Sequence, residues 1–414
     1  MKNSFGLGKI RELIQEDVDF YKLVVTMFLS AIIGPSSRLV LPLYFHSYGL
    51  PTAEIALLMS LSGFAGIFSG LIAGKLSDMV GRKPVIAFGL LGYAIPWIII
   101  LLVPFKILFY VAMIIEGFTL QTFFTGIYAF IADVFPPEKR GSALGVWQSL
   151  FAIGSTIGQI VSVGLIYNVF GSGLYFILMS LLHVAGGFVA LLFVKESKTP
   201  QQKLATRLQS SDKQSTTFKR PGVHFSLTPS NRPLVIYLLS SILRSIGQTM
   251  ITPIFPLYLS DLGISIAEIS LIYTLASVVN MVAPAVFGKL SDKFGRKKLL
   301  IVGIIIAGIA SVLFLWATTF PQVLMVRLLS ILAAAFTTPI GLAFLTELLS
   351  SSEQGLGIGF YNSILRIDST AMGVIGGILV QSYGFNWVFI IGFITSIISA
   401  ITITFGVPEK TKMS

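Results

Sequence analysis

Six ionisable side chains lie inside long apolar stretches of this 414-residue sequence, where charge is costly. Four are arginines and two are acids: Arg38, Glu116, Arg244, Arg327, Arg366 and Asp368. Each costs roughly 2.5 to 3.5 kcal/mol at the centre of a bilayer. Six unpaired groups would cost about 15 to 20 kcal/mol, which reaches or exceeds the stability of a typical protein. They must pair, reach the membrane surface or line water, so they are the first candidates for a functional site.

The two acids could carry a proton. Glu116 and Asp368 are the only acids placed deep in the apolar stretches, where a carboxyl group could bind and release a proton, and Glu116 is slightly favoured. Arg38 and Glu116 both fall in the outer halves of their stretches. Arg366 and Asp368 are two positions apart and therefore face different sides of one helix.

The arginine excess points to an anion. Four arginines against two acids leave a net charge of +2 in the central region, which favours a cavity that tolerates or selects an anionic substrate. Other polar or aromatic side chains on these stretches complete the candidate cavity: Gln121, Tyr128 and Gln248. Tyr128 is as well explained by packing as by binding.

Membrane-spanning helices must position these groups. The sequence is 54% hydrophobic and 11% charged, against roughly 25% charged in soluble domains. It predicts an all-α membrane protein with twelve transmembrane helices in two pseudo-symmetric six-helix bundles. The predicted spans are 23–44, 55–76, 85–103, 107–134, 144–167, 173–194, 234–258, 269–290, 299–317, 322–348, 358–382 and 386–407. Pro35, Pro42, Pro253 and Pro256 are expected to bend the first and seventh spans.

Charge distribution gives the expected domains and orientation. The domains are an amphipathic segment at 1–22, bundles at 23–194 and 234–407, a linker at 195–233 and a tail at 408–414. Of 29 lysines and arginines, 24 lie on the side that holds the termini, so the positive-inside rule places both termini in the cytoplasm. The net charge of +11 is thus explained without a nucleic-acid partner. The expected partners are the lipid bilayer, a small-molecule substrate and protons, and we expect a monomer in the plasma membrane.

The chain repeats itself at an offset of 214 residues. Residues 42–83 and 256–297 align without a gap and share 17 of 42 positions. Both copies contain a charged turn, GKLSDMVGRK at 74–83 and GKLSDKFGRK at 288–297. In the first turn, Gly81 would relieve backbone crowding and Gly74 would allow a close helix approach. Asp78 could cap a helix N-terminus or accept a bond from Arg82.

These turns resemble those of the major facilitator superfamily. The resemblance rests on Gly74, Asp78, Gly81, Arg82 and Lys83, with copies at Gly288, Asp292, Gly295, Arg296 and Lys297. It implies twelve helices, of which the first, fourth, seventh and tenth line the cavity. We therefore expect Arg38 and Glu116 to pair, either as a static bridge or as part of a working site. The resemblance also implies a cytoplasmic gate in which these turns latch the halves together; the alternative is that the basic residues of the turn, Lys75, Arg82 and Lys83, serve only as topology anchors. Asp133 and Arg140 match positions that the family uses to brace the latch. Glu347 repeats the acid, whereas Gln354 stands where a second arginine would be, so the second brace should be weaker.

Two departures concern the family's efflux members. They often carry an arginine in the fourth helix, three residues before a Gln-Gly pair, but this chain has Met113 followed by Glu116. The antiporter pattern Gly-x-x-x-Gly-Pro is present as Gly154 and Gly158, with Gln159 in place of proline.

The resemblance favours proton-coupled efflux of small amphipathic molecules by alternating access. Proton-coupled uptake or exchange of an organic anion is an alternative, supported by the arginine excess. A non-transporting sensor or scaffold with the same fold is a second alternative. With no cysteine and no His-Glu-x-x-His helix, the sequence favours neither a metal, a cofactor nor an enzyme.

Overall fold

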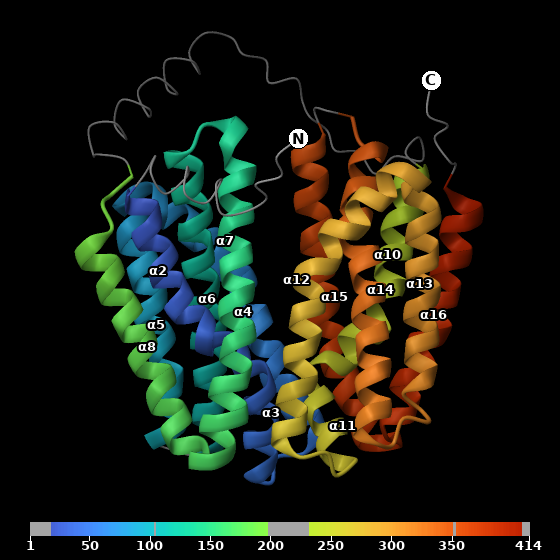
Figure 1. Ribbon diagram of the computed structural model, residues 1–414, viewed down its shortest axis with the longest axis horizontal. Helices are drawn as coiled ribbons and strands as arrows, with labels where there is room; N and C mark the ends of the chain where they lie inside the picture. Colours follow the sequence, from blue (N-terminus) through green and yellow to red (C-terminus); the bar gives the residue numbers. More distant parts are fainter. Residues whose placement is uncertain (1–17, 103–104, 198–231, 351–352, 408–414) are drawn as a thin grey trace, which may run out of the picture. The chain divides into compact units, whose positions relative to one another are not determined.

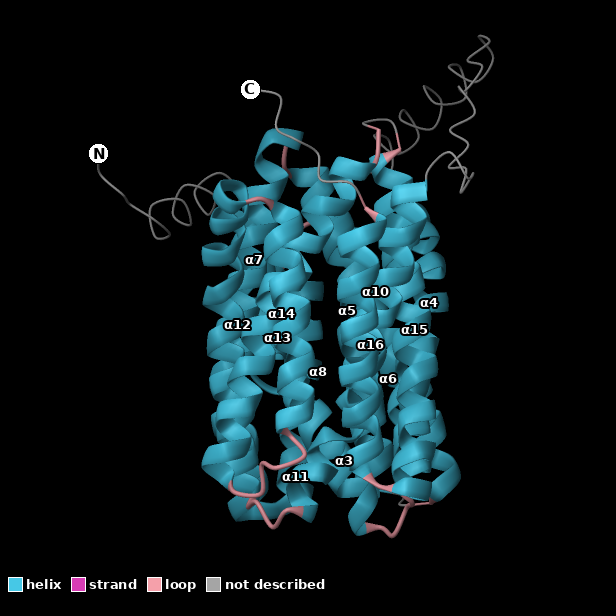
Figure 2. Cartoon of the chain, turned by 90° about the vertical axis from the view of Figure 1, so that its right-hand side faces the viewer, coloured by secondary structure: helices cyan, strands magenta, loops and turns pink. Residues whose placement is uncertain are grey.

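The computed structural model describes residues 18–102, 105–197, 232–350 and 353–407. Every regular element within these ranges is a helix (Figure 2). Most of the predicted segment 1–22, nearly all of the linker 195–233 and the tail 408–414 lie outside the described residues. The all-α prediction is therefore confirmed for the part of the chain that is described.

The helices follow the apolar stretches closely. In the first half they are α2 (Val18–Ile33), η1 (Gly34–Ser36), α3 (Ser37–Ser47), α4 (Thr52–Val80), α5 (Arg82–Leu102), α6 (Lys106–Val134), α7 (Pro137–Gly158), η2 (Gln159–Phe170) and α8 (Gly171–Phe193). In the second half they are α10 (Arg232–Ile251), η4 (Thr252–Ile254), α11 (Phe255–Asp261), α12 (Ile266–Phe294), α13 (Arg296–Leu313), α14 (Phe320–Leu348), α15 (Gln354–Tyr383) and α16 (Phe385–Gly406).

Nine stretches among the described residues are long and apolar enough to cross a membrane. One of them, Lys139–Phe193, is 55 residues long and contains both α7–η2 and α8. The interrupted first span, α2–η1–α3, and α13, which begins with three basic residues, fall outside the nine. When each interrupted helix is counted as one, the described helices follow the predicted spans in order along the chain.

Prolines interrupt the first and seventh spans, as predicted. The α-helix gives way to a short 3-10 turn at Gly34–Ser36, which contains Pro35, and again at Thr252–Ile254, which contains Pro253. Proline lacks a backbone N–H and its ring crowds the preceding turn, so an α-helical hydrogen bond is lost there. Pro42 lies inside α3 and Pro256 inside α11.

The described chain divides into two compact units. The first contains residues up to Ser37 and from Leu61 to Lys219, and the second contains Arg38–Ser60 and residues from Arg220 onward. The division therefore falls at the break in the first span and assigns 38–60 to the second unit. The domain boundaries drawn from the sequence stay a prediction.

Each unit is held by the same helix pairs. In the first unit α5 packs on α6 and α8, and α2 packs on α7 and α8. In the second, α13 packs on α14 and α16, and α10 on α15 and α16 (Figure 1). Since α5, α6 and α8 match α13, α14 and α16 in the sequence repeat, the repeat extends to the packing inside each unit.

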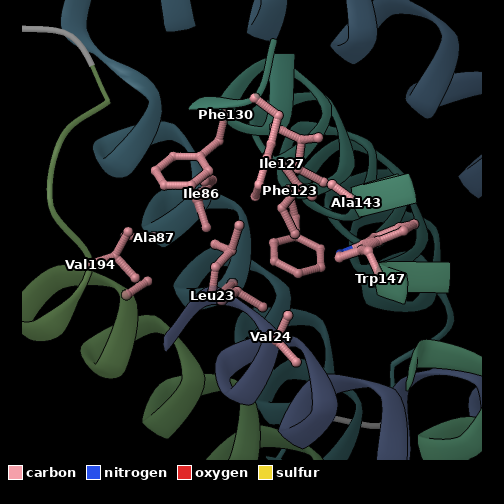
Figure 3. Close-up of a cluster of buried hydrophobic side chains, with 14 residues drawn as sticks. Leu23, Val24, Ile86, Ala87, Phe123, Ile127, Phe130, Ala143, Trp147 and Val194 are labelled. Atoms are coloured by element: carbon pink, nitrogen blue, oxygen red, sulfur yellow. The ribbon is translucent and has the colours of Figure 1, made fainter. Parts of the chain in front are cut away.

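Both units enclose an apolar core. Figure 3 shows that of the first unit, where Phe123 and Ile127 of α6 meet Ile86 of α5, Leu23 of α2 and Trp147 of α7. In the second unit Tyr237 of α10 and Phe344 of α14 are part of a corresponding cluster, with ring centroids 5.4 Å apart. These cores fix the rotation of each helix and hence the direction of its polar side chains.

Candidate functional site

Glu116 is a buried carboxylate held by neutral hydroxyl groups. Its side chain lies on α6 and the residue is 2% exposed. Ser62 of α4 donates to Oε2, and the Tyr93 hydroxyl of α5 donates to Oε1 at 3.0 Å. Arg38, its predicted partner, is exposed and belongs to the other unit, so the Arg38–Glu116 pair stays a prediction.

A glycine brings Ser62 within reach of Glu116. A Cβ on Gly117 would overlap the backbone carbonyl of Ser62, so only glycine allows this approach of α6 to α4. One turn further along, Gln121 packs against Gly66 and Gly70 of α4, with its Cγ 3.6 Å from where a Cβ on Gly70 would lie. The small residues of α4 thus position the polar face of α6.

Tyr93 links Glu116 to an aromatic core. Its ring contacts Trp97 with centroids 5.4 Å apart and His183 of α8 at 4.6 Å. Trp97 is fully buried and lies parallel to Phe176 at 6.3 Å. Large rings therefore fill the space between α5, α6 and α8 around the carboxylate.

Asp368 is the second buried acid, and it lies in the second unit. It is 8% exposed on α15 and accepts a hydrogen bond from Ser245 of α10. Arg244 lies within electrostatic range of the same carboxylate. Arg366 is exposed, so the two neighbours on α15 face different sides, as the sequence predicts.

Arg244 and Arg327 line one pocket inside the second unit. Arg244 donates through Nη1 to Thr337 at 3.2 Å. Arg327 lies over the ring of Phe255, with its guanidinium carbon 4.6 Å from the centroid, and 5.8 Å from that of Tyr273. The lining comes from α10, α11, α13 and its C-terminal end, α14 and α16, and includes Gln248, Ser311, Ser330 and Phe389. The structure thus brings together three predicted cavity residues, Arg244, Arg327 and Gln248.

Tyr128 of α6 lies apart from these two sites. Its side chain is half exposed, and its ring packs edge-on against Trp147 with centroids 5.4 Å apart. Packing against Trp147 accounts for the position of the Tyr128 ring.

An ionic network joins the first charged turn to α6. Arg82 donates through Nη1 to Asp78 at 2.5 Å and through Nε to Asp133 at 2.7 Å. Its backbone N–H donates to Glu196 at 2.7 Å. The side chains of Arg82 and Asp133 are 11% and 8% exposed, whereas that of Asp78 is 66% exposed. The predicted Asp78–Arg82 bond is present, and the more buried partner is Asp133.

Arg140 acts on the backbone at the end of α6. Its Nε and Nη2 atoms donate to the carbonyl oxygens of Phe135, at 3.0 Å, and Ala132, at 2.5 Å. In the second unit, Gln354 donates one such bond, to Thr346 at 3.3 Å. The described residues thus show one such bond from Gln354 where Arg140 makes two, and the weaker brace stays a prediction.

The second charged turn repeats the network in a more exposed form. Arg296 contacts Glu347 at 3.1 Å, and their side chains are 27% and 40% exposed. Lys297 donates to the carbonyl oxygens of Thr404, at 2.9 Å, and Val407, at 2.6 Å, at the end of α16. The side chain of Asp292 lies outside the described residues, as do the surroundings of Gly288.

The glycines of these turns have two different outcomes. Gly81 and Gly295 adopt φ of 121° and 93°, a conformation that disfavours any side chain, so their role in the turn is confirmed. Gly74 was expected to allow a close helix approach, but no described atom lies within 4 Å of where its Cβ would be. That expectation is wrong for this structure.

The efflux-pattern glycines pack one helix onto another. A Cβ on Gly158 would overlap the carbonyl of Ile32, and one on Gly154 would lie 2.8 Å from Ala31. The pattern therefore seats α7 on α2. At Gln159, where the family pattern has proline, the helix continues as the π-helix η2.

The sequence does not predict which side chains contact these charged groups, among them Ser62, Tyr93, Ser245, Thr337 and Glu196. Serines and tyrosines are frequent in apolar helices, and nothing in their spacing shows which of them face a carboxylate on another helix. The requirement that a buried acid be hydrogen-bonded predicts that donors exist without saying where they are.

Comparison with known proteins identifies related chains. The sequence model described as Major Facilitator Superfamily matches residues 23–244 and 237–414. Multidrug resistance protein 2 of Bacillus subtilis is 24% identical over 381 residues, which cover 89% of this chain and 91% of that protein. The class H tetracycline resistance protein of Pasteurella multocida is 24% identical over 338 residues, covering 81% and 80%.

A solved structure shares the fold. The bacterial homologue of the human lysosomal transporter Spinster superposes with a TM-score of 0.76 at 13% identity. The match covers 94% of this chain and 96% of that one.

Proposed function

Because the chain belongs to the major facilitator superfamily, we propose that it exports small amphipathic molecules in exchange for protons. Membership makes it a multi-pass membrane transporter and not an enzyme. Relatives named for multidrug and tetracycline resistance support export as the direction and amphipathic compounds as the substrates. Alternating access between two bundles is the mechanism proposed with it.

The observation that carries proton coupling is the setting of Glu116. Its recorded partners, Ser62 and Tyr93, are uncharged hydroxyls. A hydroxyl donates to an ionised carboxylate and can rotate to accept from a protonated one. The same two partners therefore serve both protonation states. Asp368 also has hydroxyl partners, Ser245 and Thr249, but it has the charged Arg244 within electrostatic range as well. Glu116, whose two partners are both uncharged, is therefore the proposed proton carrier.

Substitution of the carboxyl group tests this role. In proteoliposomes with an imposed proton gradient, Glu116→Gln should abolish uphill export of tetracycline or a lipophilic dye and keep exchange without a gradient. Lys106→Gln, a charge removal at the exposed start of α6, is the matched control. Full gradient-driven export by Glu116→Gln would exclude Glu116 as the carrier. Absence of any flux from the unchanged protein, for these substrates and for organic anions, would favour the sensor or scaffold alternative.

The two ionic turns are proposed as parts of the cytoplasmic gate. The Arg82–Asp133 and Arg296–Glu347 contacts support this by joining each turn to the end of a long helix within its own unit. Both termini are proposed to be cytoplasmic, the chain to reside in the plasma membrane, and the transporter to act as a monomer. Because the chain has no cysteine, single cysteines introduced at Lys106 and Ser197 would test the orientation: an impermeant thiol reagent added outside cells should label only the first.

A further inference from the structure

The pocket of the second unit occupies a position that aromatic rings fill in the first. Residues 214 positions apart take equivalent places on α5 and α13 and on α6 and α14. The pairs are Tyr93 and Ala307, Trp97 and Ser311, Met113 and Arg327, and Glu116 and Ser330. Two large rings are thus replaced by small side chains, and an apolar methionine by an arginine. All four second-unit residues line the pocket.

The pocket is rich in positive charge and hydrogen-bond donors. Neither Arg244 nor Arg327 has an acid within salt-bridge distance among the described residues. The Nε atom of Arg327 is shielded from solvent and has no hydrogen-bond partner there. Asp368 lies within electrostatic range of Arg244. It belongs to α15, which contributes no residue to the lining of the pocket.

An unpaired buried guanidinium has a physical cost that a ligand could offset. Desolvating a cation without a compensating acid or full hydrogen bonding is unfavourable. Stacking on Phe255 satisfies the face of the Arg327 guanidinium but leaves its in-plane N–H groups free to donate. An oxyanion in the pocket would accept from those N–H groups. Ser311 and Ser330, whose hydroxyls bond to none of the described residues, could donate to it as well.

The rest of the lining is aromatic. Phe255, Phe314 and Phe389 contribute rings, and the last two are stacked with centroids 5.1 Å apart. Small-molecule sites are typically lined by aromatic side chains with a few polar groups that fix the ligand's orientation, so three rings beside the two arginines favour an organic anion over an inorganic one.

We propose that this pocket binds an oxyanion, with Arg327 as its main ligand, Arg244 and the serines as further donors, and the phenylalanines holding a small aromatic body. The ligand chemistry is that of an aromatic carboxylate. This inference rests on the proposed function only in taking the chain to be a transporter. It requires neither export nor proton coupling, and it gives the organic-anion alternative a specific site.

Ligand-dependent thermal unfolding of the purified full-length protein in detergent tests the proposal. Benzoate should raise the Tm in a concentration-dependent manner, and benzamide, which has nearly the same shape and no charge, should not. In a separate series, the Tm is measured with sulfate and with chloride in place of benzoate. An Arg327-dependent rise with sulfate and none with benzoate would support the anion site and assign it to a free inorganic anion. Equal effects of benzoate and benzamide would overturn the proposal.

Two variants locate the effect. Arg327→Met installs the residue found at the equivalent first-unit position and should weaken benzoate binding about ten- to a hundredfold, the worth of hydrogen bonds to a charged group. Ser311→Trp fills the pocket as Trp97 fills its counterpart and should also abolish the benzoate shift while leaving both arginines. Lys106→Gln removes one positive charge in the other unit and should bind benzoate normally. Unchanged benzoate binding in either pocket variant would overturn the assignment.

The outcome is separable from that of the proposed function. Binding in detergent involves no gradient, so a protein that fails to export tetracycline can still show the benzoate shift. Conversely, Glu116→Gln should leave the benzoate shift unchanged. A purely structural Arg327 would give a lower Tm in Arg327→Met and no difference between benzoate and benzamide in the unchanged protein.

Discussion

Removal of the Asp133 charge should destabilise the protein far more than removal of the Asp78 charge, although both carboxylates contact Arg82. The difference follows from burial. The side chain of Asp133 is 8% exposed and that of Asp78 is 66% exposed, at 2.7 and 2.5 Å from the guanidinium. Breaking a buried pair costs about 3 to 5 kcal/mol because a charge is left uncompensated. An exposed pair contributes about 0 to 1 kcal/mol.

The remaining Asp78 contact places Asp133→Asn at the lower end, about 3 kcal/mol. For a unit of this size that corresponds to a Tm lower by about 6 to 12 °C. Asp78→Asn should lower the Tm by about 4 °C or less, and so should Glu347→Gln, which removes the more exposed partner of Arg296 in the second unit. The three variants form a matched series because each exchanges a carboxylate for an amide of the same size.

Thermal unfolding in detergent, followed by intrinsic fluorescence, gives the ranking. A double-mutant cycle with Arg82→Gln then isolates the pairwise term, which should exceed about 1 kcal/mol for Asp133 and fall below it for Asp78. Equal Tm values for Asp133→Asn and Asp78→Asn, or a negligible coupling of Asp133 to Arg82, would show that burial does not set the strength of this contact.

Two further substitutions test helix contacts. Gly117→Ala should lower the free energy of unfolding by about 1 to 3 kcal/mol or more, because the new methyl group meets the Ser62 carbonyl. Gly74→Ala is the control: the space around Gly74 is open, so this change should be neutral or slightly stabilising. Comparable Tm losses in the two variants would contradict the close approach at Gly117. Lys297→Met removes two hydrogen bonds to the end of α16 and should lower the free energy of unfolding by about 1 kcal/mol. Hydrogen exchange of the backbone amides around Thr404 should become faster in this variant. Lys298→Met, the control, should leave that exchange unaltered.

The sequence predicts the membrane spans well because the length of an apolar run is enough to identify each of them. A run of about 20 apolar residues must be a helix to satisfy its backbone in lipid, and the charged turns at 74–83 and 288–297 mark where two such helices end. Pro35 and Pro253 predict the interruptions since proline removes a hydrogen bond wherever it occurs in a helix. The repeat offset is also fully contained in the sequence, and it extends to helix pairs that pack alike in both units.

The side-chain partners could not be predicted, because they depend on helix rotation and on distances between helices. Glu116 is visible as a buried acid, but its bond from Ser62 exists only because Gly117 lets two helices touch. Gly74 shows the opposite failure. It belongs to the same Gly-x-x-x-Gly series as Gly66 and Gly70, yet those two contact α6 and Gly74 faces open space. The series therefore predicts that α4 has a face suited to close packing, but it does not predict how far α6 extends along that face.

The Glu116 carboxylate and the Arg327 guanidinium carry opposite charges, so a proton bound to the first and an anion bound to the second have charges that cancel. A proton on Glu116 and a monoanion beside Arg327, carried in the same direction, move no net charge. A proton exchanged for a neutral drug moves one charge, worth about 2.3 kcal/mol per 100 mV of membrane potential. In proteoliposomes whose potential is clamped by potassium and valinomycin, proton-coupled benzoate flux should therefore be insensitive to the clamp, and exchange of a neutral drug should respond to it. A benzoate flux that follows the potential would show that the two sites are not occupied in one transport step.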